Sequence, residues 1–526
     1  MIPYNTFEFF IVYFGLTFIV YTILPRKVKW CALLIGSVVY YVFSANGNFV
    51  SLLVSAASIW LVGIIIQKFN DEFAIRKKEA PRTERKALKA KYKKKKLIVL
   101  NIGIILNIGL LLTLKYGNFF VGTFGSIFRL DVPTLKLVQP LGISFYTLQA
   151  VSYITDVYRG KHRAERNPLK LLTFLSFMLT IMEGPIARWE KLGPQFTESK
   201  KIGTKDLYTG AVLIGWGLFK KVVIADRAAI LVNNIFNDFN AERPGIIVFI
   251  GVLCYTLQLY CDFSGIMDVI NGLALLLGIE MPENFTRPFF AKSINEFWQR
   301  WHITLGSWLR DYIFYPISLS KPFMSLTKSA RKKFNPYYAN LIPTAVALFF
   351  VWFSNGLWHG SAWKYIVYGL YYYVLMMLGL FCEPLSAKVC AALRINRKSK
   401  AFAFFQMVRT FFIVNFGMLI FRANTLTVTG QAVKAMVTNP QFSAVLIGTK
   451  NGLGLGLLDY VILALGFFTI LFVGIAQERG IVIREKLYKL PYPVRALILL
   501  AGIVFIIIFG AYGEHYGVPD LLYANF

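Results

Sequence analysis

Runs of apolar residues recur along the whole chain, separated by short polar gaps. Apolar runs of roughly 20 residues are long enough to cross the hydrocarbon core of a bilayer as helices. We therefore predict an all-α, polytopic transmembrane bundle of about 10–13 membrane segments, in which the shorter runs form re-entrant or interfacial helices. The runs cover residues 9–24, 30–43, 52–66, 97–114, 171–182, 210–224, 246–259, 266–279, 341–353, 365–381, 404–421, 457–474 and 496–511.

The charges of the gaps predict how the chain is oriented in the membrane. The first gap, residues 25–29, is basic, and the second, 44–48, is uncharged. The third, the basic loop 67–96, is expected to be a solvated linker, and the alternatives are a solvated helix and a segment that lies along anionic lipid. Cytoplasmic loops carry an excess of Lys and Arg, so we expect the basic gaps in the cytoplasm and the N-terminus outside.

Composition supports a membrane protein and argues against other classes. The chain has 526 residues, 56% of them hydrophobic, and a net charge of +30. In a soluble protein this charge would suggest nucleic acid, but here the cations lie between apolar runs and no nucleic-acid motif accompanies them. Membrane lipid is therefore the expected partner, and we expect no nucleic acid. With no nucleotide-binding motif in a suitable context, residues 1–526 are best described as one integral membrane domain.

The five cysteines and four histidines form no metal-binding pattern, so we expect no metal. The histidines differ in their surroundings. His162 lies in a basic loop and is expected to be solvated, and His515 follows the last apolar run and is expected at the surface. His302 and His359 lie among apolar and aromatic residues, where an ionisable side chain is costly and commonly functional.

His359 lies between the runs 341–353 and 365–381, where a membrane hairpin has to turn. A neutral imidazole suits such a site, because it need not bury a charge at rest. It can accept a proton from a hydroxyl group as that group attacks an acyl thioester. The alternative is a core histidine bonded to a backbone carbonyl, and position alone favours neither.

His302 lies in a stretch, 295–312, that is rich in aromatic and charged residues. If this stretch formed one continuous helix, its apolar residues would share one face and His302 would lie beside that face. This predicts either an interfacial helix with a tryptophan belt or a second polar group in a channel. Neither histidine has a Ser or Cys in a nucleophile motif, so direct transfer between two bound substrates is the enzymatic interpretation. The face would consist of Trp298, Trp301, Leu305, Trp308 and Leu309.

An ordered series of motifs between residues 139 and 360 resembles the membrane-bound O-acyltransferase family, and most closely its bacterial alginate O-acetyltransferase branch. Each motif is weak by itself, and the series is specific. The carrying residues are Gln139-Pro140-Leu141-Gly142-Ile143-Ser144-Phe145-Tyr146-Thr147, Asp156-Val157-Tyr158-Arg159-Gly160, Gly184-Pro185-Ile186-Ala187-Arg188, Tyr260-Cys261-Asp262-Phe263-Ser264-Gly265, Pro282-Glu283-Asn284-Phe285, Phe297-Trp298-Gln299-Arg300-Trp301-His302-Ile303-Thr304, Trp308-Leu309-Arg310-Asp311-Tyr312 and Gly356-Leu357-Trp358-His359-Gly360.

The resemblance implies a helical funnel through the membrane with His359 as the catalytic residue and His302 as the second functional one. His359 would act as general base toward the acceptor hydroxyl or position the acyl carbonyl, and His302 would line the channel. Asp262 and Asp311 are also interpreted as helix-terminus or ion-pair partners. The substrate-channel candidates are Asp262, Arg300, Arg310, Asp311, Asn355 and Trp358.

The resemblance also implies substrates and partners in the bacterial plasma membrane. The acyl donor would be cytoplasmic acetyl-CoA, or else the thioester of an acyl carrier protein, with no permanently bound cofactor. The acceptor would be a cell-surface polysaccharide, reached with a secreted or surface partner of the SGNH-esterase type. The spans within 404–511 fit the alginate branch, and the tail 521–526 matches it only loosely. The alternatives are D-alanyl transfer to teichoic acid and a transporter or polymer-export subunit without chemistry.

Overall fold

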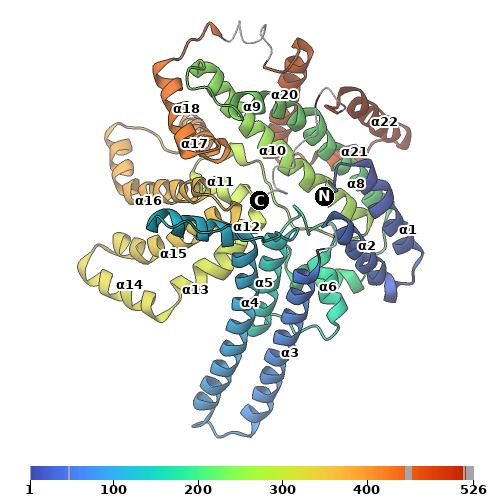
Figure 1. Cartoon of the computed structure of the whole chain (residues 1–526), viewed down its shortest axis with the longest axis vertical. Coiled ribbons are helices and arrows are strands. Elements are labelled where there is room, and N and C mark those ends of the chain that lie inside the picture. Colours follow the sequence, from blue (N-terminus) through green and yellow to red (C-terminus); the bar gives the residue numbers. More distant parts are fainter. Residues whose placement is uncertain (1, 46–47, 199, 445–452, 513–515, 517–526) are drawn as a thin grey trace. The chain divides into compact units, whose positions relative to one another are not determined.

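The computed structural model describes residues 2–45, 48–198, 200–444, 453–512 and 516 (Figure 1). Within these ranges the chain is helical and contains no strand, and ten helices are long and apolar enough to cross a membrane. The prediction of an all-α, multi-pass membrane protein is therefore confirmed. His515 and the tail 521–526 lie outside the described residues.

The chain folds into two compact units. The first contains Met1–Gly210 and Ile270–Pro282, and the second contains Ala211–Val269 and Glu283–Phe526. The single domain and the central funnel both stay predictions. The first unit holds η1 (Phe9–Gly15), α1 (Leu16–Ile23), η2 (Arg26–Val28), α2 (Lys29–Ser44), α3 (Val50–Glu79), α4 (Arg85–Phe128), α5 (Ile143–Arg159), α6 (Pro168–Ser176), α7 (Trp189–Thr197), the start of α8 (Thr204–Leu218) and the end of α10 (Gly245–Leu276).

The segment 67–96 is not the expected linker but two helix ends joined by a short turn. α3 continues to Glu79, α4 begins at Arg85, and the two helices run side by side (Figure 1). Side chains join the two extensions, since Tyr92 Oη donates to Glu72 at 3.2 Å and Lys96 Nζ to Asn70 at 2.7 Å. Helix-forming Ala, Leu and Lys residues favour this outcome, so the prediction of a linker is wrong and the segment is helical.

α5 contacts α3 and α4 and is the most buried helix of the first unit. Every residue from 143 to 157 is buried, including Ser144, Thr147, Gln149 and Ser152. These polar residues interrupt the apolar pattern, which is why no run marks this helix. The run 171–182 is only partly helical, because α6 ends at Ser176 and buried irregular backbone follows. Such backbone is tolerated at membrane depth where protein surrounds it.

Besides the rest of α8 and most of α10, the second unit holds the remaining helices of the described residues. They are η3 (Phe219–Ala225), α9 (Asp226–Phe236), η4 (Pro288–Phe290), α11 (Ile294–Arg300), α12 (Ile303–Leu309), η5 (Arg310–Phe314), α13 (Tyr315–Ser318), α14 (Lys321–Lys333), α15 (Pro336–His359), α16 (Trp363–Ala392), α17 (Lys400–Arg422), α18 (Leu426–Thr438), α20 (Leu457–Glu478), α21 (Ile483–Tyr488) and α22 (Tyr492–Phe509).

The runs 246–259 and 266–279 belong to one helix, α10, and not to two segments. The polar residues between them are accommodated without a break. Asp262 forms an ion pair with Lys221 of η3, and Gly265 packs so closely on Gly217 of α8 that a Cβ atom on either would overlap the other's carbonyl oxygen. Small residues allow helix backbones to approach in this way in membranes.

α15 and α16 form the hairpin predicted around His359. α15 ends at His359, and α16 begins four residues later. A Cβ atom at Gly356 would overlap the carbonyl oxygen of Tyr365, and one at Gly369 would overlap that of Trp352. The two glycines therefore let the helices approach closely at the end that carries the histidine.

α22, the last helix described, has no buried residue, although its C-terminal end is tied to the unit. Arg227 Nη2 donates to the carbonyl oxygen of Phe509 at 2.8 Å, and the backbone nitrogen of Ala511 donates to Val222 at 2.9 Å. Arg227 in turn pairs with Asp459 of α20 at 2.8 Å.

Candidate functional site

His302 lies at a break between two short helices rather than on one continuous helix. α11 ends at Arg300, α12 begins at Ile303, and His302 has a left-handed backbone with φ of 48°. The single-helix interpretation of 295–312 is therefore wrong. The reason lies in the preceding loop, where Thr286 donates its backbone N–H to Arg300 at 2.9 Å and replaces helical pairing at this point.

Asn284 organises the break with one side-chain oxygen. Its Oδ1 accepts hydrogen bonds from the backbone nitrogen of Thr304 at 3.1 Å and from Thr304 Oγ1 at 2.9 Å. Because the backbone nitrogen can only donate, the atom that it contacts must be the amide oxygen. His302 Nδ1 lies 3.1 Å from the same oxygen, so Nδ1 carries a hydrogen and donates it. In the neutral ring, Nε2 then keeps its lone pair.

His359 is fixed in the same tautomer by its own helix. Its Nδ1 lies 2.7 Å from the carbonyl oxygen of Asn355, which can only accept, so Nδ1 donates here as well. Nε2 of the neutral ring therefore carries a lone pair and can accept a proton. A core histidine would make the same backbone contact, and this bond by itself does not separate the two interpretations.

Trp358 joins the two histidines into one aromatic cluster. Its ring centroid lies 5.5 Å from that of His302 and 5.1 Å from that of His359. Phe263 packs edge-on against His302 at 4.8 Å, and Phe421 against His359 at 5.5 Å. Both imidazoles are only 2% exposed. The cluster is therefore shielded from bulk solvent, which strengthens electrostatic interactions with a bound group.

Burial keeps His302 neutral. Desolvation lowers the pKa of His302 well below its usual value, and the neighbouring imidazole of His359 lowers it further. The site thus holds two acceptor nitrogens and no permanent positive charge on His302 at neutral pH.

Some of the other predicted site residues belong to this cluster, and the rest form ion pairs elsewhere. Asn355 is buried and supplies the carbonyl for His359, while its side-chain oxygen has no hydrogen-bond partner within the described residues. Arg300 pairs with Glu296 at 2.7 Å and Glu478 at 3.1 Å, and exposed Arg310 contacts Asp311 at 3.2 Å. Asp262 pairs with Lys221. The structure therefore joins His302, His359, Trp358 and Asn355, and gives the other four candidates ion-pair partners.

Sequence reasoning missed a buried charge cluster within the membrane segments of the second unit. Lys221 Nζ lies 2.8 Å from Asp226 and 2.5 Å from Asp262, and all three side chains are buried. Nearby, Lys220 contacts Asp268 at 2.7 Å. A signal was available, since cations inside an apolar run are rare and usually paired. Asn284 belongs to one of the motifs that carry the resemblance, but the sequence does not show its contacts with residues about 20 positions further along the chain.

No group of three or more His, Cys, Asp or Glu side chains within the described ranges could hold a metal ion. The cluster offers proton acceptors, an aromatic wall and buried amide groups. These features suit proton transfer at a bound hydroxyl group.

Comparisons with known proteins point to one family. The model of the family described as MBOAT, membrane-bound O-acyltransferase, matches residues 161–331, a range that includes His302 and ends before His359. The chain is similar to the probable alginate O-acetylase AlgI of Pseudomonas putida, with 34% identity over 70% of this chain and 71% of that protein. It is 31% identical to the peptidoglycan O-acetyltransferase of Helicobacter pylori over 64% of each.

A third similarity reaches a different transferase. The teichoic acid D-alanyltransferase of Bacillus subtilis is 32% identical over 55% of this chain and 70% of that protein. The chain spans about two thirds of the length of its alginate O-acetylase relatives, for example 66% of the one from Pseudomonas aeruginosa.

Proposed function

Because the chain belongs to the membrane-bound O-acyltransferase family, we propose that it transfers an acyl group, acetyl in the leading version, for O-acylation of a cell-surface polysaccharide. The prediction of an O-acyltransferase is confirmed at the level of the family. The donor, the route across the membrane and the acceptor belong to the proposal.

One observation carries the catalytic part of this proposal. Two buried imidazoles flank Trp358, and each donates from Nδ1 so that its Nε2 is free of hydrogen. A general base has to present a lone pair toward the hydroxyl that it deprotonates. A neutral imidazole meets this requirement inside the membrane at little cost at rest.

The proposed step is a direct transfer. Nε2 of His359 accepts the proton of the acceptor hydroxyl while the hydroxyl oxygen forms a bond to the thioester carbonyl carbon. The carbon–sulfur bond then breaks, and the leaving thiolate takes the proton from His359 to become a thiol. His302, neutral and held by Asn284, orients the reacting groups from the other side of Trp358.

The donor and the partners are proposed from the resemblance. Acetyl-CoA on the cytoplasmic side is the proposed donor, with the thioester of an acyl carrier protein as the alternative. A secreted or surface protein of the SGNH-esterase type is the proposed partner, and a polysaccharide or peptidoglycan outside the membrane is the final acceptor. The acetyltransferase relatives support acetyl as the transferred group.

D-alanyl transfer to teichoic acid is the second candidate. The Bacillus subtilis relative favours it, because its name specifies that reaction. Incubating membranes that contain the chain with labelled acetyl-CoA, or with a labelled D-alanyl carrier protein, separates the two. Label from acetyl-CoA in the polymer supports the leading version, and D-alanine esters on the polymer would refute it.

The test of catalysis is His359→Gln, with His162→Gln as the matched control in a basic loop. Loss of the general base should lower polymer acylation by about 10²–10⁴-fold, while membrane insertion and the elution profile of the purified protein stay unchanged. The control should retain full activity. Full acylation by the His359 variant would favour an export subunit without chemistry.

A further inference from the structure

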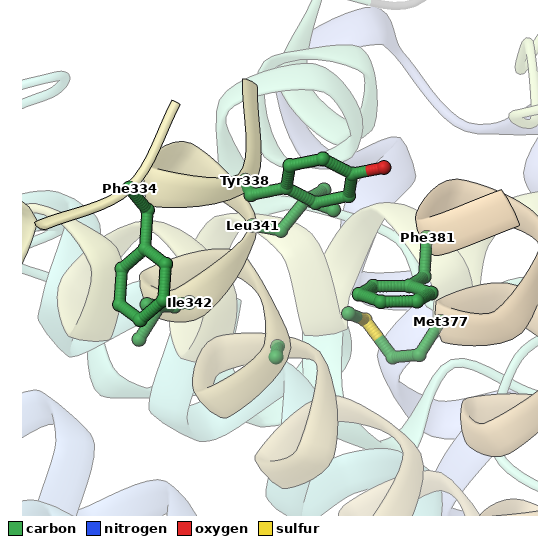
Figure 2. Close-up of a pocket in the computed structure, with 7 residues that line it drawn as sticks. Phe334, Tyr338, Leu341, Ile342, Met377 and Phe381 are labelled. Atoms are coloured by element: carbon green, nitrogen blue, oxygen red, sulfur yellow. The ribbon is translucent and has the colours of Figure 1, made fainter. Parts of the chain in front are cut away.

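An open groove lies between α15 and α16 beside the end of α14. Its volume is about 640 Å³, within the usual range for ligand sites. Phe334 and Ile342 lie on one side of the opening and Met377 and Phe381 on the other (Figure 2). The lining consists of Phe334, Tyr338, Leu341, Ile342, Ala345, Met377 and Phe381.

The lining selects an apolar occupant. The phenol oxygen of Tyr338 is the only polar side-chain atom that these seven residues contribute. Phe334 and Phe381, at the rim, are 53% and 59% exposed. Apolar surface of this kind, open to its surroundings in a membrane protein, is stable in contact with hydrocarbon and unfavourable in contact with water.

The helix that leads into the groove is strongly basic. α14 contains no acidic residue, and its apolar stripe Phe323, Leu326 and Ala330 repeats at helical spacing. The helix is therefore amphipathic, with the pattern of helices that lie at a membrane surface. Its five cations are Lys321, Lys328, Arg331, Lys332 and Lys333.

The cations and the groove are held together by specific contacts. Arg331 donates from Nη2 to Asn340 Oδ1 of α15 at 3.0 Å, and Lys332 and Lys333 directly precede Phe334 at the rim. On the other side, Tyr337 Oη donates to the carbonyl oxygen of Leu380 at 2.6 Å. α14, α15 and α16 thus keep positive charge beside an apolar opening.

Acidic residues near the rim do not offset this charge. Glu383 follows the groove on α16 and is paired with Arg397 at 2.8 Å. Lys332 and Lys333 are exposed, with no ion pair recorded for either side chain among the described residues. We propose that the groove binds an acyl chain of an anionic diacyl phospholipid whose phosphate group contacts Lys332 and Lys333.

The positive charge of Lys332 and Lys333 favours an anionic phospholipid over a neutral one. Each Lys or Arg near a surface with anionic lipid contributes about fivefold in affinity. A groove filled by bulk lipid alone would show no headgroup preference. A polyprenyl-phosphate carrier would place a branched chain and a different headgroup at the same rim.

The experiment uses the full-length protein in micelles of a non-ionic detergent that contain a trace of phosphatidylglycerol with a photoactivatable acyl chain. Cross-linked peptides are mapped by mass spectrometry. We expect label within residues 334–345 and 377–381. Unlabelled phosphatidylglycerol should displace it at a concentration at least about fivefold lower than phosphatidylcholine does.

Two variants test the headgroup and the chain separately. Lys332→Gln combined with Lys333→Gln should weaken labelling by on the order of fivefold for each lysine removed. Ala345→Trp fills the groove and should abolish labelling there. The matched control, Lys77→Gln combined with Lys78→Gln on exposed positions of α3, should leave labelling unchanged.

Three results would overturn the proposal. Equal displacement by phosphatidylglycerol and phosphatidylcholine would show bulk lipid only. Preferential displacement by a polyprenyl phosphate would assign the groove to a carrier lipid. Labelling that is indifferent to the double lysine variant would show that these cations do not bind the headgroup.

Discussion

At the scale of the residue, Asn284 uses one oxygen atom to hold a histidine and a helix start together. Three donors converge on Oδ1, from His302 and from the backbone and side chain of Thr304. His302 has positive φ, a conformation that costs a non-glycine residue roughly 1–2 kcal/mol. The bonds to Asn284 offset that cost and fix which ring nitrogen carries the hydrogen.

Replacing Asn284 should therefore affect catalysis through His302. Asn284→Leu keeps the size but removes the acceptor, and we expect acyl transfer to fall by roughly tenfold or more, the low end of general-base effects. Asn284→Asp restores an acceptor and adds a negative charge, which raises the pKa of His302. It should recover part of the activity and move the acid limb of the pH–rate profile to higher pH. Equal damage by both variants, with an unchanged profile, would indicate a purely structural role.

The protonation of His302 can be measured directly. In the folded protein its pKa lies well below the usual value, so nitrogen NMR of labelled histidine should show a neutral ring from pH 7.5 to about 5.5. In the denatured chain the ring should titrate near 6.5. Since the unfolded state then binds more protons, stability should decrease as pH falls below about 6.5. His302→Gln assigns the resonance, and a folded-state midpoint near 6.5 would contradict the expectation.

Those parts of the candidate site that depend on residue type and on spacing along the chain could be predicted from the sequence. His359 could be placed at a hairpin turn because the flanking runs fix where the chain reverses. An ion-pair role for Asp262 was among the interpretations, but its partner Lys221 could not be predicted, since it lies on another helix. The break at His302 was missed because the residues from Trp298 to Leu309 fit a helical period, while the preceding loop supplies the competing backbone bonds.

At the scale of the element, the buried lysine of η3 joins two segments through its charge. Lys221 faces Asp226 and Asp262, so the three ionised groups carry one net negative charge. Taking charges out of water is costly, and only mutual attraction offsets that cost. Removing one member should therefore be far more damaging than removing a surface pair.

We expect Lys221→Met to destabilise the protein by about 3–5 kcal/mol, because two carboxylates are left without a counter-charge. Thermal unfolding in detergent, followed by the loss of the monodisperse elution peak, measures this. Adding Asp226→Asn and Asp262→Asn to the variant should restore much of the stability. Lys200→Met, in an exposed pair with Glu280, is the control and should cost at most about 1 kcal/mol. Similar losses in both lysine variants would refute this account.

Helices with continuous apolar runs could be predicted, and helices with mixed faces could not. α15, α16, α17 and α20 contain the runs predicted for them, and α22 contains all but the last two residues of its run. α5 was missed because polar side chains such as Gln149 alternate with its apolar ones, although all are buried within protein. A continuous apolar run marks a helix that faces lipid, whereas a helix packed among other helices can carry polar residues. Apolar runs therefore do not identify helices such as α5.

At the scale of the whole molecule, the basic helical extension of α3 and α4 marks one side of the membrane. Its turn, residues 80–84, is flanked by many lysines and arginines, whereas the gap between α2 and α3 is uncharged. The positive-inside bias therefore predicts that the turn of α3 and α4 lies in the cytoplasm.

Cysteine labelling tests this orientation. In a background without the native cysteines, Glu84→Cys should react with an impermeant maleimide only in inside-out vesicles. Asn48→Cys, in the uncharged gap, should react only in right-side-out vesicles. Protein permeabilised with detergent should label at both positions, which controls for accessibility. The opposite pattern would place the N-terminus inside.

Because α22 has no buried residue, the bilayer itself is a structural partner of the protein. Its 18 residues span about 27 Å, slightly less than a typical hydrocarbon core of about 30 Å. Phe505 contacts Phe219 of η3, but most side chains of α22 are exposed, so membrane thickness decides how well this helix fits. Any mismatch acts on the backbone at Phe509, where Arg227 connects it to Asp459. A change in lipid chain length would therefore be transmitted to the buried Arg227–Asp459 ion pair through the C-terminal end of α22.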